Sequence, residues 1–237
     1  MWFERPFSDR RHAGHVLAGA VATHLAGAAR DDVVVLGLPR GGVPVAFEVA
    51  RKLGAPLDVF IVRKLGVPGH DELAMGAIAS GEVLVHNRDV IDALGIDDGD
   101  VESVILKERA ELARRELSYR ESAPPLDVAG KIVVLVDDGI ATGSTIRAAI
   151  AAIHDRGARR IIVAAPVAPK ETCSQLTAIA DDVVVVEVPE RFRAVGEAYE
   201  DFTQTTDAEV HDLLARARLP GSSTSSSDGS DGEHTSQ

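Results

Sequence analysis

Cysteine, aromatic residues and long apolar runs are all scarce in this sequence. The single cysteine, Cys173, excludes an internal disulfide and a cysteine-rich metal cluster, and we expect it to pack as a small hydrophobe. The longest apolar runs, such as Val33–Leu36 and Ile132–Val136, are far shorter than the ~20 residues that cross a bilayer. The first residues lack the basic region and apolar stretch of a signal peptide. We therefore expect no membrane association and a cytoplasmic location.

Basic residues are also in short supply, since 25 of them face 37 acidic ones and give a formal charge of −12. That charge repels nucleic-acid phosphates, so no nucleic-acid partner is expected, whereas a small anion needs only a local cluster of donors. The 237 residues are 45% hydrophobic and can bury one substantial core. We expect one domain at residues 1–220. The Ser/Gly/Asp-rich tail at 221–237 has no apolar residue and is expected to be disordered.

Short apolar runs alternate with amphipathic stretches along the chain. The pattern predicts strands at 33–36, 57–62, 131–136, 160–165 and 183–188, and helices at 10–29, 43–53, 145–156 and 169–180. Continuous Val/Ile runs separated by helices are typical of an α/β fold with a mainly parallel sheet.

A long insertion separates the second and third predicted strands. We expect a loop at 63–72, a hairpin of 73–78 with 82–86, and a helix at 100–120. The apolar side of that helix is predicted to carry Val101, Ile105, Leu112 and Leu117.

The most informative motif is the segment Val133–Thr145, VVLVDDGIATGST. Its Thr-Gly-Ser-Thr end presents N–H groups and hydroxyls at a helix N-terminus, which suits a phosphate. Asp137 and Asp138 would repel a phosphate, but they can accept hydrogen bonds from vicinal sugar hydroxyls or support hydrated Mg²⁺. An ordinary strand end with turn-forming Asp and a capping Thr is the alternative. The complete pattern favours a sugar-phosphate site.

This segment closely resembles the motif with which type I phosphoribosyltransferases bind 5-phosphoribosyl-1-pyrophosphate (PRPP). The resemblance covers roughly residues 8–202 and implies that family's fold, with an inserted hairpin and helix and a small hood-like C-terminal segment. It implies that Asp137 and Asp138 act in catalysis and hold Mg²⁺ through water. The PRPP contacts that it implies within the motif are Asp137, Asp138, Gly139, Ile140, Ala141, Thr142, Gly143, Ser144 and Thr145.

Two basic segments also follow predicted strands, where ligands bind in such sheets. Glycines after the first strand let N–H groups approach an anion, and the resemblance gives Arg40, Gly41 and Gly42 the pyrophosphate of PRPP. The segment from Arg63-Lys64 to His70 is similar to a closing loop of adenine phosphoribosyltransferases, which implies that Arg63 and Lys64 lie near the pyrophosphate and assist catalysis. The alternative for the first segment is a flexible strand-to-helix turn with a solvated arginine, and the alternative for the second is a solvated basic pair. His70 and Glu72 are further candidates to reach the reaction centre.

An aromatic segment follows the last predicted strand, in a chain that is only 4% aromatic. It resembles the base-stacking region of hypoxanthine-guanine phosphoribosyltransferases, which implies that Pro189 and Phe192 bind the base. For Tyr199 and Phe202, a small satellite core under the C-terminal helix is the alternative. Ala141 stands where enzymes for 6-oxopurines carry an aspartate, so the acceptor base stays open.

The resemblance implies a Mg²⁺-dependent enzyme that transfers the phosphoribosyl group of PRPP to a nucleobase-type acceptor, as in purine salvage, and releases pyrophosphate. Two alternatives keep the same pocket: a PRPP or nucleotide sensor without turnover, and a hydrolase or phosphorylase. The oligomeric state is open, with a homodimer as one possibility.

Overall fold

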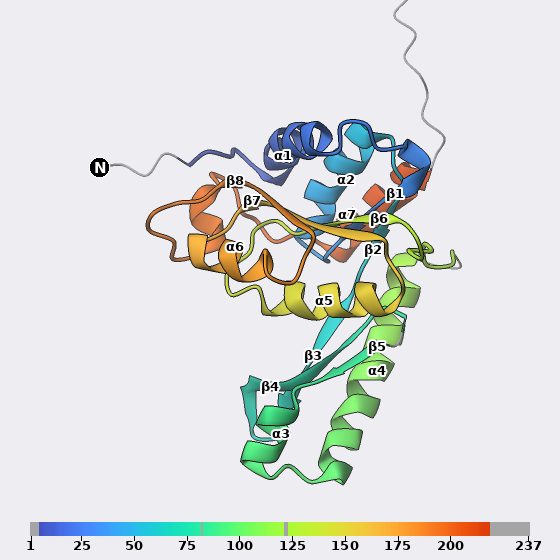
Figure 1. Ribbon diagram of the computed structural model, residues 1–237, viewed down its shortest axis with the longest axis vertical. Coiled ribbons are helices and arrows are strands. Elements are labelled where there is room, and N and C mark those ends of the chain that lie inside the picture. The colour runs from blue at the N-terminus through green and yellow to red at the C-terminus, as the bar shows by residue number, and fades with distance from the viewer. Residues whose placement is uncertain (1–4, 82, 121–122, 219–237) are drawn as a thin grey trace, which may run out of the picture.

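The computed structural model describes residues 5–81, 83–120 and 123–218, without the side chains of Arg30, Asp71 and Glu72. The tail predicted at 221–237 lies outside these residues. Five parallel strands form the central sheet in the order β2-β1-β6-β7-β8 (Figure 1). They are β1 (Val33–Gly37), β2 (Leu57–Val59), β6 (Ile132–Val136), β7 (Arg160–Val167) and β8 (Asp182–Glu187). The predicted parallel α/β fold is confirmed.

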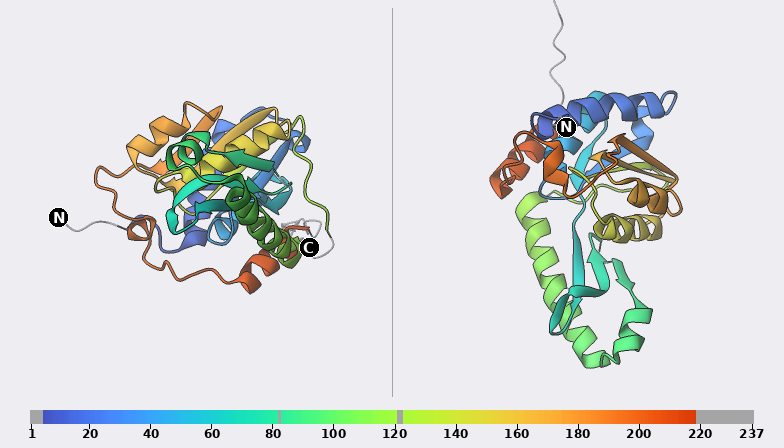
Figure 2. Two further views of the ribbon diagram at one scale, coloured as in Figure 1. Left: turned by 90° about the horizontal axis from the view of Figure 1, so that it is seen from below. Right: turned by 90° about the vertical axis from the view of Figure 1, so that its left-hand side faces the viewer.

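Helices cover both faces of this sheet (Figures 1 and 2). One face carries α1 (Arg10–His24), α2 (Gly42–Leu53) and α7 (Asp207–Arg218), and the other carries α5 (Ser144–Asp155) and α6 (Lys170–Leu176). Short 3₁₀ helices lie at Arg30–Asp32 (η1) and Val195–Ala198 (η2).

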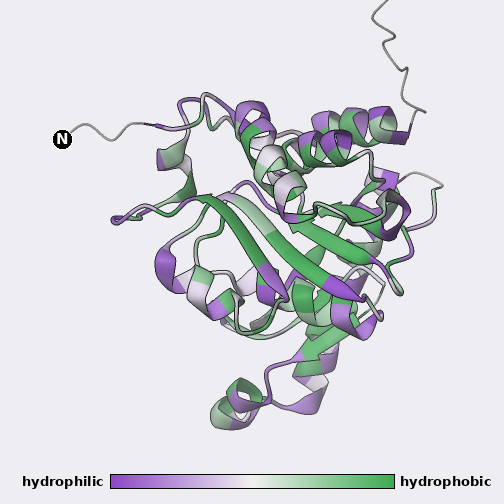
Figure 3. Cartoon of the chain, turned by 45° about the horizontal axis from the view of Figure 1, so that its top comes forward, coloured by the Kyte–Doolittle hydropathy of each residue, from purple (hydrophilic) through white to green (hydrophobic). Residues whose placement is uncertain are grey.

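Alternate residues of the inner strands enter different cores. Val134 and Val136 pack in the cluster that includes α1 and α2, whereas Val133 and Leu135 pack with α5. β1 and β6 therefore contain no charged or polar side chain, and Figure 3 shows hydrophobic residues along the middle of the sheet with hydrophilic ones at some strand ends.

The insertion forms an arm that extends away from the central sheet (Figures 1 and 2). It consists of an antiparallel sheet of β3 (Val62–Val67), β4 (His70–Ala79) and β5 (Val83–His86), followed by α3 (Arg88–Leu94) and α4 (Asp98–Arg120). The predicted hairpin and helix are confirmed. The loop predicted at 63–72 is wrong, because β3 pairs with β4 through an irregular register and buries Leu65 and Val67. Leu117 is 69% exposed and does not join the apolar side of α4.

Buried polar contacts fix the end of α4 to the central sheet. Arg120 is 5% exposed, and its Nε lies 3.0 Å from both carboxylate oxygens of Asp58, in β2. Its Nη2 donates to the carbonyl of Val59 at 2.7 Å. A buried guanidinium without such partners would be costly, so these bonds favour one position of the arm. No helix among the described residues is both long and apolar enough to cross a membrane.

Candidate active site

Two loops pack directly on each other where β1 and β6 end. The backbone N–H of Leu38 donates to the carbonyl of Val136 at 2.9 Å. A Cβ atom at Gly41 would collide with Oδ2 of Asp138, and one at Gly42 would lie 2.7 Å from the carbonyl oxygen of Val136. Glycine is thus needed at position 42, where the contact is with backbone, and at position 41 it lets the Asp138 carboxylate keep its place. The Arg40–Gly42 loop, which follows a cis peptide between Pro39 and Arg40, therefore borders the two aspartates.

Asp137 and Asp138 lie in hydrogen-bond contact at this border. The N–H of Asp138 donates to Oδ1 of Asp137 at 2.9 Å. Burial, and then the charge of Asp138, raises the pKa of Asp137 well above its usual range. Burial also raises the pKa of Asp138, although Arg10 opposes the shift. Two such carboxylates favour a proton, a hydroxyl donor or a cation between them.

Arg10, in the first turn of α1, holds Asp138 from the other side. Its Nε lies 2.7 Å from Oδ2 of Asp138, its Nη1 donates to the carbonyl of Thr203 at 2.7 Å, and its Cζ lies 4.0 Å from the ring centre of Phe202. Sequence reasoning missed this residue. The local pattern does not distinguish it from Arg11, whose side chain is 76% exposed.

The start of α5 has the features of an anion site. Gly143 is its N-cap with a φ of 70°, and no side chain caps the first turn. Thr142 and Ala141 are exposed, and the hydroxyl of Thr142 lies 3.3 Å from that of Ser144. N–H groups of a first turn lack intrahelical acceptors, and the helix dipole favours negative charge there. The predicted Thr-Gly-Ser-Thr segment thus lies at a helix N-terminus.

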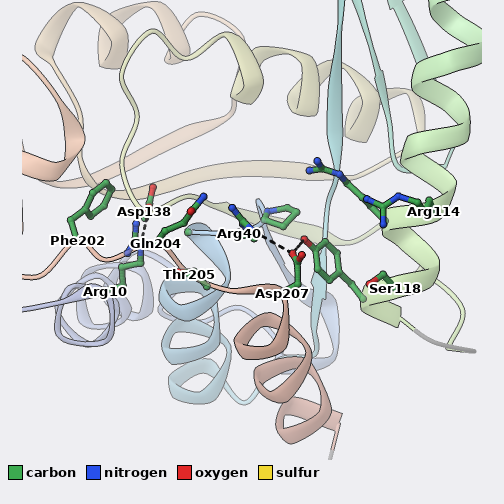
Figure 4. A pocket seen from close by; sticks show the side chains of 13 residues that line it. Arg10, Arg40, Arg114, Ser118, Asp138, Phe202, Gln204, Thr205 and Asp207 are labelled. Atoms are coloured by element: carbon green, nitrogen blue, oxygen red, sulfur yellow. Dashed lines mark hydrogen bonds and ion pairs between the residues drawn. The ribbon is translucent and has the colours of Figure 1, made fainter.

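A cavity of about 480 Å³ lies beside the Arg40–Gly42 loop (Figure 4). Its wall comes from five separate segments of the chain. The lining residues are Arg10, Pro39, Arg40, Gly41, Arg114, Arg115, Ser118, Tyr119, Asp138, Phe202, Gln204, Thr205 and Asp207. Four arginines face two aspartates, which gives the cavity a positive balance inside an acidic protein.

Arg63 and Lys64 do not line this cavity. Both belong to β3, whose successive side chains point to opposite faces. Arg63 binds Glu108 of α4, with its Nε 2.8 Å from Oε2, whereas Lys64 faces a second hollow beside Ser144 and Arg147. The structure does not bring this pair together as a cationic loop, and its catalytic role stays a prediction.

The other two candidates from this segment lie on the arm. His70 begins β4, next to the turn that joins it to β3. The side chain of Glu72 lies outside the described part of the chain. Their roles also stay predictions.

Pro189 and Phe192 line a smaller hollow of about 210 Å³, together with Val167 and Ala198. This hollow is close to the PRPP-like motif, because a Cβ at Gly139 would collide with a methyl group of Val195 and lie 3.0 Å from one of Val167. The two predicted base-binding residues are thus near the motif but outside the arginine-lined cavity.

Tyr199 is a core residue. It is 1% exposed, its ring centre lies 5.6 Å from that of Phe7, and its hydroxyl donates to the carbonyl of Asp138. The satellite core considered for Tyr199 exists, but Phe7 and Ala13 form it rather than the C-terminal helix. Phe202 packs beside Tyr199, with ring centres 5.0 Å apart, and also lines the cavity with Arg10.

Comparisons with known proteins agree on one family. Residues 12–201 match the phosphoribosyl transferase domain, and the chain belongs to this family. A Mycobacterium tuberculosis protein named "Putative phosphoribosyl transferase" is 47% identical over 211 residues, which are 89% of this chain and 47% of that protein. The "Bifunctional protein PyrR" of Chloroflexus aurantiacus is 34% identical over 120 residues, 50% of this chain and 60% of that protein. The chain thus spans about half the length of the curated relatives it matches.

A solved structure of similar length has the same fold. The crystal structure of TT1426 from Thermus thermophilus is 45% identical, covers 89% of this chain and 98% of its own, and has a TM-score of 0.78.

Proposed function

Because the chain belongs to the phosphoribosyl transferase domain family, we propose that it binds PRPP with Mg²⁺ and transfers the phosphoribosyl group to a nucleobase-type acceptor, with release of pyrophosphate. The observation that carries this proposal is the packing of the Arg40–Gly42 loop against Asp137 and Asp138, beside the uncapped start of α5. A sugar with phosphate groups at two ends needs such a pair of anion sites on either side of hydroxyl acceptors.

Each part of the site has a role in this proposal. The N–H groups and hydroxyls of Thr142, Ser144 and Thr145 bind the 5′-phosphate. Asp137 and Asp138 accept hydrogen bonds from the ribose hydroxyls and favour the positive charge that develops on the sugar. Arg40 and the N–H groups after it bind the pyrophosphate and stabilise its growing charge as it leaves.

The aspartate pair also fits Mg²⁺. Within the described residues no group of three or more His, Cys, Asp or Glu side chains is placed to hold a metal ion. Mg²⁺ typically uses one or two carboxylates together with water and substrate phosphates, so two aspartates suffice if PRPP supplies the other oxygens. When bound, the ion would neutralise charge on the pyrophosphate.

The acceptor would bind beside the segment that follows β8, where Pro189 and Phe192 line a hollow that suits a flat base. No acid occupies the position of Ala141, so acceptors that must give up a proton to a carboxylate there are disfavoured. The cytoplasmic location and the oligomeric state stay predictions.

Pyrophosphate release from PRPP and Mg²⁺, measured with a panel of bases, tests this function. We expect release that depends on one base or a small group of bases. PRPP should also raise the melting temperature more than ribose 5-phosphate does, and PRPP at ~100 times its Kd adds about 2.7 kcal/mol to the free energy of unfolding. Affinity without turnover would identify a sensor, and release without any base would identify a hydrolase. Equal effects of PRPP and ribose 5-phosphate on melting would remove the pyrophosphate assignment.

A further inference from the structure

The wall of the arginine-lined cavity opposite Arg10 and Phe202 belongs to the arm, not to the central sheet. Figure 4 shows Arg114 and Ser118 on α4 at one side, Phe202 and Arg10 at the other, and Arg40 between them. Arg115 of α4 also lines the cavity. The family resemblance assigned no ligand contact to this helix, so its arginines need a separate explanation.

The end of α4 is held close to the Arg40 loop. The hydroxyl of Tyr119 donates to Asp207 of α7, and Nη1 of Arg40 lies 3.8 Å from the same carboxylate oxygen. Arg115 and Arg40 line the same cavity as Tyr119, and each acts to lower the pKa of that phenol. Burial and Asp207 outweigh them and raise that pKa to about 12. Arg115 and Arg40 thus reach the same part of the cavity from two different elements.

Acidic partners position the two α4 arginines without covering them. Glu111 accepts from Nε and Nη2 of Arg114 at 2.7 and 2.9 Å, and from Nε of Arg115 at 2.8 Å. The side chains nevertheless remain 67% and 37% exposed, respectively. A guanidinium has five N–H donors, so Glu111 engages one edge of Arg114 and one nitrogen of Arg115 and leaves further donors, including both Nη1 groups, for a ligand.

The acids in the cavity wall are already engaged. Asp138 binds Arg10, and Asp207 binds Tyr119 and Arg40. All four arginines of the wall also have a carboxylate partner, and it is their remaining N–H donors that an anion can bind. Arginines present such donors in a fork that matches phosphate oxygens.

We propose that Arg114 and Arg115 bind the diphosphate group of PRPP, and the pyrophosphate released from it, across the cavity from Arg40. This inference rests on the proposed function. It assigns to the arm a direct part in donor binding: α4 supplies the cations on one side of the diphosphate, and the loop after β1 supplies those on the other.

The test uses the full chain with Arg114 and Arg115 both changed to Ala. Lys107→Ala is the matched control, because Lys107 is exposed two turns earlier on the same side of α4 and does not line the cavity. Calorimetric titrations with inorganic pyrophosphate, PRPP and ribose 5-phosphate, each with Mg²⁺, give the affinities. We expect the double variant to raise the Kd of pyrophosphate and PRPP by about tenfold or more. The Kd of ribose 5-phosphate should stay within about twofold of the unmodified chain, and Lys107→Ala should change none of the three.

Three results would overturn the inference. In the first, the double variant and Lys107→Ala have the same Kd for pyrophosphate while the unmodified chain binds PRPP. The role of Arg114 and Arg115 would then be wrong, but the proposed function would stand. Another is an equal loss for ribose 5-phosphate, which would show a general disturbance of the site. The third is an unmodified chain that binds neither PRPP nor pyrophosphate, in which case the proposed function fails as well. If the double Ala variant unfolds, Arg114→Lys with Arg115→Lys decides between the first result and the proposal, because it keeps the charge but loses the fork, and we then expect a smaller rise in the same two Kd values.

Discussion

The two walls of the candidate site are built in different ways. The sheet-edge wall consists of two short continuous segments, Arg40–Gly42 and Asp137–Thr145, each placed by the strand before it. The second wall is assembled from distant parts of the chain, with α4 of the arm at one side of the cavity and the segment before α7 at the other, where Arg10 reaches Asp138 across 128 positions of sequence. The first wall carries its chemistry in contiguous residues and the second only through tertiary contacts. Changes in the first wall are therefore expected to affect the reaction most, and changes in the second to affect positioning and ligand choice.

The largest effect is expected from Asp137→Asn combined with Asp138→Asn. The change keeps side-chain size but removes both negative charges that favour positive charge on the sugar. A charge-assisted hydrogen bond contributes ~1.5–3 kcal/mol, so turnover should fall by about a hundredfold or more, with PRPP affinity reduced less. Steady-state kinetics, titration and circular dichroism measure the three properties. A folded variant with unchanged turnover would contradict the catalytic role, and loss of folding would support an ordinary capped turn.

A second prediction separates the two ends of the sugar-phosphate within the first wall. Arg40→Ala should weaken PRPP binding by about tenfold and spare nucleoside monophosphates, because Arg40 lies at the pyrophosphate end. Thr142→Ala should weaken the binding of PRPP and of nucleoside monophosphates, because both carry a 5′-phosphate. Parallel titrations of the two variants provide the comparison. If both substitutions harm both ligands alike, the proposed orientation of the substrate is wrong.

In the second wall, Arg10→Gln should act mainly on stability and on the state of Asp138. Asp138 is 14% exposed in its side chain and would lose its cationic partner. Breaking a partly buried ion pair of this kind costs ~1–3 kcal/mol, and the pKa of Asp138 should rise further. Chemical denaturation measures the first effect and the pH dependence of PRPP binding the second. Arg193→Gln, at an exposed position, is the control, and equal stability of the two variants would contradict a positioning role for Arg10.

The smallest effect concerns pH, and it follows from the raised pKa of Asp137. Between the usual aspartate pKa and the raised value, the folded protein binds more protons than the unfolded chain. The free energy of unfolding should therefore fall as the pH rises through this window. Melting temperatures measured across this window would show the decline in the unmodified chain and a flatter curve in Asp137→Asn. Asp155→Asn, an exposed position, should follow the unmodified chain, and identical curves for all three would exclude Asp137 as the cause.

The arm shows where local patterns mislead. Gly66, Pro68 and Gly69 made the segment after Arg63 look like a flexible loop, which is what a closing catalytic loop requires. In the structure, pairing with β4 absorbs the irregular backbone in two register shifts, and Leu65 and Val67 bury themselves in the core. Tertiary burial outweighed local propensity, and the two basic residues were thereby separated onto opposite faces of a strand.

The sequence by itself determined the parallel sheet, its flanking helices and the sheet-edge wall of the site. These features depend on residues that are neighbours in the chain: apolar runs that must be buried on both faces, and a motif that follows a strand and opens a helix. Only the tertiary structure decided that Arg10 holds Asp138, that Tyr199 is a core residue, and that Arg114 and Arg115 line one cavity with Arg40. These contacts arise from the packing of α1, α4 and the chain before α7, and isolated charged residues carry no signal of the partner they will meet after folding.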